Sequence, residues 1–198
     1  GGRELELDAV SEVPRYYVCN AYGVCGIYSA PGTAVKEAYD TSGIVTNDRG
    51  VTVWLKGNRV SRNQIMAIKE ESVTEQKNSL AVCLDNILRH AGITRNTEYD
   101  LAQGKTATTI LSENMTGVQV LDLSGCTLDA VLYYVNQDIP VLAILEDGEA
   151  VLVTGFNEFN VVIMEPATGK LYKKGMNDAT AWFAENGNHF ITYMRTEN

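Results

Sequence analysis

The sequence predicts an α+β fold in which helices come first and an antiparallel sheet follows, and two observations indicate it. Residues 80–91 carry apolar side chains at helical spacing, with Asn78 or Ser79 available to cap the start and Gly92 to end the helix. After residue 136, short apolar runs follow one another with turn-forming residues between them, as in the buried strands of a sheet. These runs are residues 141–145, 150–155 and 161–164.

The other elements of the second half follow from the same reasoning. We expect two short helices, a strand, a helix capped by Ser124, a last helix and a last strand, at residues 98–103, 106–113, 118–123, 128–136, 178–185 and 190–194. A short apolar pattern at residues 64–71 predicts a connecting helix or strand. No repeated period is visible.

A smaller unit precedes this part. Its pattern predicts two strands joined by a tight turn, a helix and two more strands, at residues 16–18, 24–28, 31–42, 44–45 and 51–55. Cys19 and Cys25 would lie near each other across the first hairpin, either as a disulfide or as two half-buried thiols. We therefore predict a flexible lead over residues 1–13, a small β-β-α-β-β accessory unit over 14–60 and a larger domain over 61–198.

Composition excludes several classes of function. The 198 residues are 45% hydrophobic and 21% charged, which is typical of a globular protein, and the apolar runs are too short to span a bilayer. The net charge is -9 and the basic residues are scattered, so we expect no nucleic-acid partner. No metal-ligand spacing and no phosphate-binding glycine loop occur, so we expect neither a metal nor another cofactor.

The first residues also bear on location. The chain opens on Gly1-Gly2 instead of Met, so we expect a piece of a longer protein whose other parts could tether it to a membrane. An extracytoplasmic or cell-surface bacterial location is favoured over the cytoplasm.

Three stretches match the spacing of one known family. They are SLAVCLDNIL at residues 79–88, GEAVLVTGF at 148–156 and EPATG at 165–169. In order and spacing, residues 79–194 resemble the papain-like cysteine peptidases of the bacteriocin-processing (double-glycine leader) type. The resemblance implies a papain-like domain, in which a long helix packs on an antiparallel sheet, and a role that involves peptides.

The resemblance also implies where the catalytic residues would lie. The positions of the family's Cys, His and Asp are held here by Ser79, Glu149 and Glu165. A Ser hydroxyl beside carboxylates has neither a base of suitable pKa nor a proton donor for the leaving amine. We therefore expect a catalytically inactive domain that binds a peptide or protein segment, or acts as a regulatory module, with these three side chains lining one cleft.

Two alternatives stay open. The domain could be an active cysteine peptidase that uses Cys83, or Cys126, with His189. Cys83 lies in the apolar stripe of the helix, where a buried core residue is expected, and His90 on the same helix is too far along it to meet the thiol. The other alternative is a structural or assembly domain of an envelope protein, in which the first unit docks partners.

Overall fold

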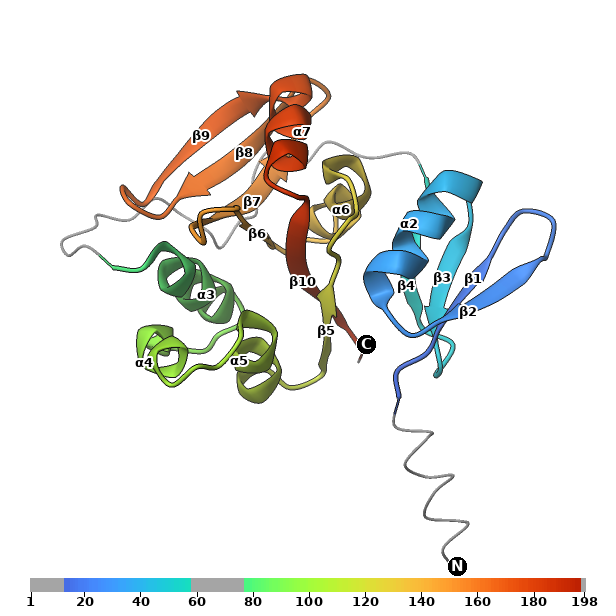
Figure 1. The fold of residues 1–198 in the computed structure, drawn as a ribbon, viewed down its shortest axis with the longest axis horizontal. Helices are drawn as coiled ribbons and strands as arrows, with labels where there is room; N and C mark the ends of the chain where they lie inside the picture. The colour runs from blue at the N-terminus through green and yellow to red at the C-terminus, as the bar shows by residue number, and fades with distance from the viewer. Residues whose placement is uncertain (1–12, 58–76, 197–198) are drawn as a thin grey trace, which may run out of the picture. The chain divides into compact units, whose positions relative to one another are not determined.

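Residues 13–57 and 77–196 are described in the computed structural model. The chain divides into two compact units, Gly1–Gly57 and Asn58–Asn198, and each is described by itself (Figure 1). The predicted element at residues 64–71 lies outside the described residues.

The first unit is a four-stranded antiparallel sheet with one helix. The strands lie in the order β2-β1-β3-β4. In chain order the elements are β1 (Tyr16–Cys19), β2 (Cys25–Tyr28), α2 (Pro31–Thr41), β3 (Ile44–Asn47) and β4 (Thr52–Leu55). The predicted β-β-α-β-β arrangement is confirmed.

Local sequence explains the helix and the turn of this unit. Helix α2 begins at Pro31, whose fixed φ suits a first turn, and ends at Thr41. The C-cap residue, Ser42, adopts a left-handed conformation with φ 56°. Between β3 and β4, the Asn47 side chain accepts hydrogen bonds from the backbone N–H groups of Arg49 (3.0 Å) and Val51 (2.9 Å). Gly50, at φ 76°, supplies the left-handed step that completes this turn.

The two N-terminal cysteines form a disulfide. The register of β1 and β2 places Cys19 directly opposite Cys25, and their Cα atoms are 4.1 Å apart. Of the two possibilities that the sequence left open, the structure shows the covalent one. The bond closes the first hairpin beside its turn, between the last residue of β1 and the first residue of β2.

The second unit is a six-stranded sheet with helices packed on it. The strands lie in the order β5-β10-β6-β7-β8-β9, and every neighbouring pair is antiparallel. In chain order the elements are α3 (Ser79–His90), α4 (Thr97–Ala102), α5 (Ala107–Asn114), β5 (Val118–Asp122), α6 (Leu128–Val135), β6 (Val141–Ile144), β7 (Ala150–Phe156), β8 (Asn160–Glu165), β9 (Lys170–Gly175), α7 (Met176–Glu185) and β10 (His189–Arg195). The predicted α+β class is confirmed.

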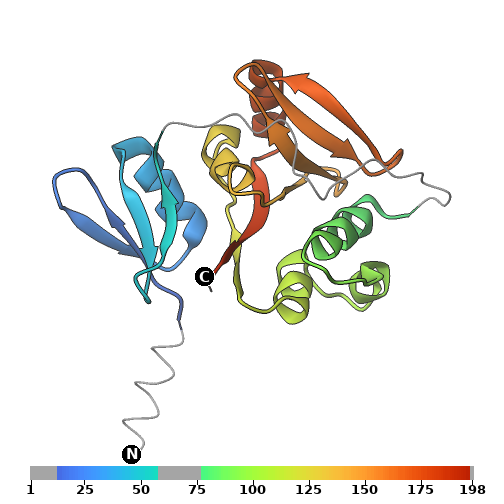
Figure 2. The same ribbon diagram turned by 180° about the vertical axis from the view of Figure 1, so that it is seen from behind.

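Helices cover the middle of this sheet. Strand β7 is buried along its whole length, which is expected when both faces of a strand are covered. Helix α3 packs on β7 and β6, while α6, which contacts α7, packs on β6, β7 and β10. The two views place α3 on one side of the sheet and α6 with α7 on the other (Figures 1 and 2).

The caps of α3 agree with the sequence, and the cap of α6 does not. Asn78 is the N-cap of α3, and its side chain accepts from Leu80 N at 2.9 Å. Helix α6 is capped by Thr127, whose hydroxyl accepts from Ala130 N, so the prediction of Ser124 was wrong. The Ser124 hydroxyl is occupied locally, because it donates to Asp122 Oδ1 at 2.5 Å.

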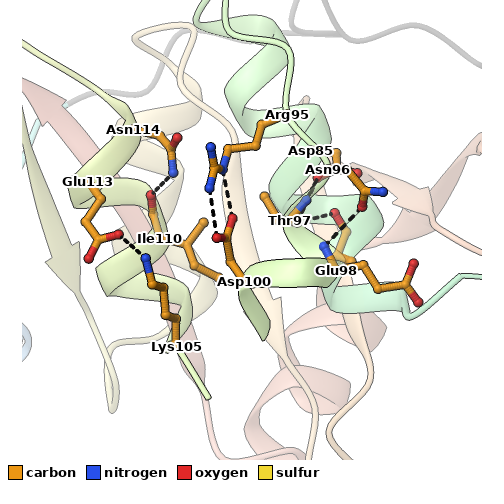
Figure 3. A network of polar contacts seen from close by, with 11 residues as sticks. Asp85, Arg95, Asn96, Thr97, Glu98, Asp100, Lys105, Ile110, Glu113 and Asn114 are labelled. Carbon is orange, nitrogen blue, oxygen red and sulfur yellow. Dashed lines mark hydrogen bonds and ion pairs between the residues drawn. The ribbon is translucent and has the colours of Figure 1, made fainter. Parts of the chain in front are cut away.

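A polar network holds α3 against α4 (Figure 3). The buried Thr97 donates through its backbone N–H (2.8 Å) and its hydroxyl (2.7 Å) to Asp85 Oδ1, and Asp85 lies on α3. Arg95 forms a two-pronged ion pair with Asp100, with both N···O distances 2.8 Å, and this pairing lowers the pKa of the Asp100 carboxyl. The network fixes the position of the helix whose N-terminus forms the site below.

Strand β9 was not predicted from the sequence. It is the last strand at its end of the sheet in the described part of the chain, and Lys170, Tyr172 and Lys173 on it are exposed. Its side chains therefore lack the apolar alternation that marks a half-buried strand.

No helix of the described residues is long and apolar enough to cross a membrane.

Candidate functional site

A cavity of about 540 Å³ opens at the N-terminus of α3. Three segments that are distant in sequence form it: the start of α3, the β6–β7 turn and the β8–β9 turn. The described residues that line it are Lys77, Asn78, Ser79, Asp147, Gly148, Glu149, Pro166 and Ala167.

Ser79 ties the helix to the sheet. It is the first residue of α3, and its Oγ accepts a hydrogen bond of 2.9 Å from the backbone N–H of Ala150, the first residue of β7. The pairing of β7 with β8 begins only at Leu152, so this N–H lies beyond the β8 ladder. The hydroxyl thus satisfies a backbone donor that would otherwise be buried without a partner.

The β6–β7 turn presents two carboxylates to the cavity. Leu145 and Glu149 close the turn through a bond of 2.8 Å from Leu145 N to Glu149 O, and Gly148 N donates to Leu145 O at 3.0 Å. Gly148 has φ 86°, a conformation that favours glycine. Asp147 Oδ1 accepts from Glu149 N at 2.9 Å, which orders the turn that carries both acidic side chains.

Glu165 departs from the expected arrangement. It ends β8 opposite Lys170, it is exposed, and it is not among the residues that line the cavity. Its successors Pro166 and Ala167 line the cavity instead. Burial, and then the negative charge of Glu165, raise the pKa of Tyr172 on β9. The prediction that all three family positions line one cleft is therefore correct for Ser79 and Glu149 and wrong for Glu165.

The cavity holds neither a thiol nor an imidazole. The chain has four cysteines and two histidines, all of them described, and none lines the cavity. Among the described lining residues the ionisable groups are one ammonium, from Lys77, and two carboxylates, from Asp147 and Glu149. Their formal charge is -1.

The two cysteines outside the disulfide, Cys83 and Cys126, are core residues. Cys83 has no exposed surface, and burial raises the pKa of its thiol well above the usual value. Cys126 is 1% exposed. A raised thiol pKa lowers the fraction of thiolate, which is the nucleophilic form.

The two histidines lie in other places. His90 Nε2 lies 2.8 Å from the backbone oxygen of Asp138. His189 begins β10, where its Nε2 lies 4.0 Å from Asp122 Oδ1 on the neighbouring strand β5. The structure thus gives each histidine a partner of its own, outside the cavity.

Sequence reasoning missed part of the cavity wall. Lys77, Asp147, Pro166 and Ala167 line it without having been singled out. The Asp-Gly pair at residues 147–148, one residue before a buried strand, was a signal for a tight turn that presents an acidic side chain.

Comparisons with known proteins bear on the fold. No protein-family model and no curated protein matches the sequence. Among solved structures, a protein from Bacillus anthracis assigned as a C39-like peptidase has a TM-score of 0.58 and 12% sequence identity. The match covers 70% of this chain and 100% of that one.

The fold is peptidase-like. At 12% identity the similarity concerns the fold, and the chemistry must be argued from the side chains of the cavity.

Proposed function

We propose that this chain contains a catalytically inactive peptidase-like domain that binds a peptide segment in the cavity at the N-terminus of α3. One observation carries the proposal. In a peptidase-like fold, the cavity that contains Ser79 and Glu149 contains no cysteine and no histidine.

The chemistry of Ser79 supports inactivity. Peptide cleavage by a hydroxyl or thiol needs a neighbouring base to take the proton and an acid to protonate the leaving amine. Glu149 is a weak base for a hydroxyl, and the two histidines are elsewhere. The Ser79 oxygen already accepts the Ala150 N–H, which directs a lone pair to the protein instead of to a substrate.

The same residues suit non-covalent binding of a peptide. A peptide backbone offers alternating N–H donors and carbonyl acceptors. The carboxylates of Asp147 and Glu149 can accept from backbone or amine donors, and the Lys77 ammonium can donate to carbonyl oxygens. Pro166 and Ala167 add a small apolar wall.

The first test is turnover. The full chain should not cleave fluorogenic peptides with a double-glycine site at neutral pH, and an epoxide probe for cysteine peptidases should not label it. Cleavage that disappears in Cys83→Ala or in Cys126→Ala would overturn the proposal.

The second test is binding. An array of random twelve-residue peptides, probed with the labelled full chain, should yield sequences whose capture depends on the cavity. Glu149→Gln should weaken capture, whereas Glu146→Gln in the same turn should not, because both side chains are exposed but only Glu149 lines the cavity. Equal capture by both variants would contradict binding at this site.

A larger side chain in the cavity wall provides a second pair of variants. Ala167→Trp should block the cavity, whereas Thr168→Trp, one residue further along, should leave it open. Capture that survives Ala167→Trp would place the peptide elsewhere.

An assembly role of the first unit is a second candidate. The outer face of its sheet leaves Ile27, Ile44 and Leu55 exposed, at 65%, 47% and 40%. Apolar side chains gathered on one face are a feature of surfaces that bind another protein. Sedimentation of the full chain should then show self-association that Ile27→Asp abolishes, and a monomer at all concentrations would remove this candidate.

A further inference from the structure

Strand β2 is the outer strand of the first unit's sheet (Figure 1), and within the described ranges it pairs with β1 alone. Asn20 N donates to Val24 O at 3.0 Å, so the carbonyl of Val24 faces β1. Backbone groups alternate in direction along a strand, so those of Gly26 also face β1, and those of Cys25 and Ile27 point outward. No hydrogen bond within the described part of the chain engages these outward groups.

The side chains of this edge do not protect it. An edge strand usually carries lysine, proline or another residue that prevents pairing with a further strand. The sequence of β2 is CGIY, which has none of these. The uncharged stretch extends beyond the strand, because residues 16–35 contain no Asp, Glu, Lys or Arg in a chain that is 21% charged. Val24 and Ile27 are each 65% exposed, so the edge presents apolar side chains to solvent.

The hairpin that carries the edge is held in shape before any partner arrives. The disulfide joins Cys19 to Cys25 beside the turn. The Asn20 side chain accepts from the backbone N–H groups of Tyr22 (2.9 Å) and Val24 (3.1 Å). An edge that is already ordered loses little conformational entropy when a strand pairs with it.

From these observations we infer that the β2 edge pairs with β2 of a second copy of this chain, antiparallel, about a two-fold axis at Gly26. In this register Cys25 and Ile27 of one copy exchange backbone hydrogen bonds with Ile27 and Cys25 of the other. On one face Ile27 lies beside the second copy's Cys25. On the other face Val24 lies beside the second copy's Tyr28, so apolar side chains meet on both faces of the joined sheet.

Charge favours a second copy over a charged segment of another protein. The chain has a net charge of -9, so two copies repel each other wherever their acidic residues approach. A contact through residues 16–35 brings together two surfaces without charged side chains. The same residues offer no group that would form an ion pair with an acidic or basic segment.

The inference rests on the assembly candidate above, because it names the contact through which copies associate, and it does not involve the cavity at α3. The two can fail separately. A chain that stays monomeric removes both. Self-association that survives changes on β2 and is lost in Ile44→Lys, on the outer face of β3, keeps the assembly role and removes the edge contact.

Sedimentation velocity of the full chain, without reductant and from micromolar to millimolar concentration, measures the dimer. Ile27→Lys places a charge at the contact and should weaken dimerisation about tenfold. Ile44→Lys makes the same change at another exposed isoleucine, which β1 separates from the edge, and should weaken it less than about twofold. Ile27→Pro removes an outward N–H that takes no part in the β1–β2 ladder, and should also weaken the dimer.

Amide hydrogen exchange, followed residue by residue by NMR, tests the strand pairing itself. The amides of Cys25 and Ile27 should exchange fast in the monomer and be protected in the dimer, whereas the Gly26 amide, which faces β1, should be protected in both. Circular dichroism shows whether each variant is folded, and Ile27→Lys gives the test if Ile27→Pro is not.

Three outcomes would overturn the inference. They are a monomer at millimolar concentration, a dimer in which the Cys25 and Ile27 amides exchange as fast as in the monomer, and equal weakening of the dimer by Ile27→Lys and Ile44→Lys.

Discussion

The hydrogen bond between Ser79 and Ala150 should have a measurable share in the stability of the second unit. Replacing Ser79 with alanine leaves the backbone N–H of Ala150 without its acceptor at 2.9 Å. Because Ala150 is 1% exposed, water hardly reaches this N–H group. An unsatisfied buried donor costs about 1–3 kcal/mol. Alanine is a better helix former than serine by about half a kcal/mol. The free energy of unfolding should therefore fall by about 1–2 kcal/mol.

Urea unfolding followed by circular dichroism, with calorimetry for the midpoint, measures this loss. A decrease of this size corresponds to about 2–8 °C in the melting temperature of a domain of this length. Ser112→Ala is the matched control, because Ser112 is an exposed residue of α5, and it should leave stability within about half a kcal/mol. If Ser79→Ala and Ser112→Ala unfold at the same urea concentration, Ser79 does not join the helix to the sheet.

Four further predictions concern the N-cap of α3, the burial of Cys83, the independent folding of residues 61–198 and the stability of the protein in acid. Asn78→Ala should cost about 1 kcal/mol in thermal unfolding through loss of the cap, and Asn78→Asp should cost little. In the Ser79→Cys variant, iodoacetamide added to the folded protein should label the introduced thiol and leave Cys83 unlabelled, as measured by mass spectrometry. Labelling of both thiols at the same rate would contradict the buried position of Cys83. Residues 61–198 expressed alone should give dispersed NMR signals and unfold cooperatively, and a molten fragment would show the boundary misplaced. The pKa of Asp100 is lowered in the folded state, so the stability that its ion pair contributes is present above the ordinary Asp pKa and is lost as pH falls through the folded value. Asp100→Asn should therefore flatten the acid side of the curve of unfolding free energy against pH. An unchanged curve would refute the pairing.

The elements that were predicted well are those whose signals are local. Helix α3 has an apolar stripe, a capping Asn78 and a terminating Gly92 at φ 84°, so three neighbouring features agree on its limits. Strands β6 and β7 are apolar on both faces, because helices cover both sides of the sheet. In each case the pattern reports burial, and burial follows from the position in the sheet.

Strand β9 shows why local signals have limits. Its sequence, KLYKKG, has no apolar alternation, since it lies at the edge and its side chains meet solvent on much of their surface. What makes it a strand is the ladder with β8, from Glu165↔Lys170 to Asn160↔Gly175. That pairing is a contact between two segments, and the β9 segment alone does not encode it.

The cap of α6 failed for a related reason. Ser124 and Thr127 are both suitable capping residues, and propensity does not rank them. The structure shows that the Ser124 hydroxyl bonds to Asp122, which leaves Thr127 as the cap. Competition between two local hydrogen bonds decided the outcome.

The part of the candidate site that a single hydrogen bond fixes was predictable from the sequence. Ser79 begins α3, Glu149 directly precedes β7, and the bond from Ala150 N to Ser79 Oγ joins these two ends, so both side chains meet the same cavity. No such bond ties Glu165 to the helix; it belongs to the end of the β8 ladder, opposite Lys170. Because side chains alternate along a strand, one residue decides whether a position faces a cavity, and at this point the cavity wall passes to Pro166 and Ala167. Spacing along the chain can therefore locate a residue on an element, while the contacts between elements determine which of these residues share a site.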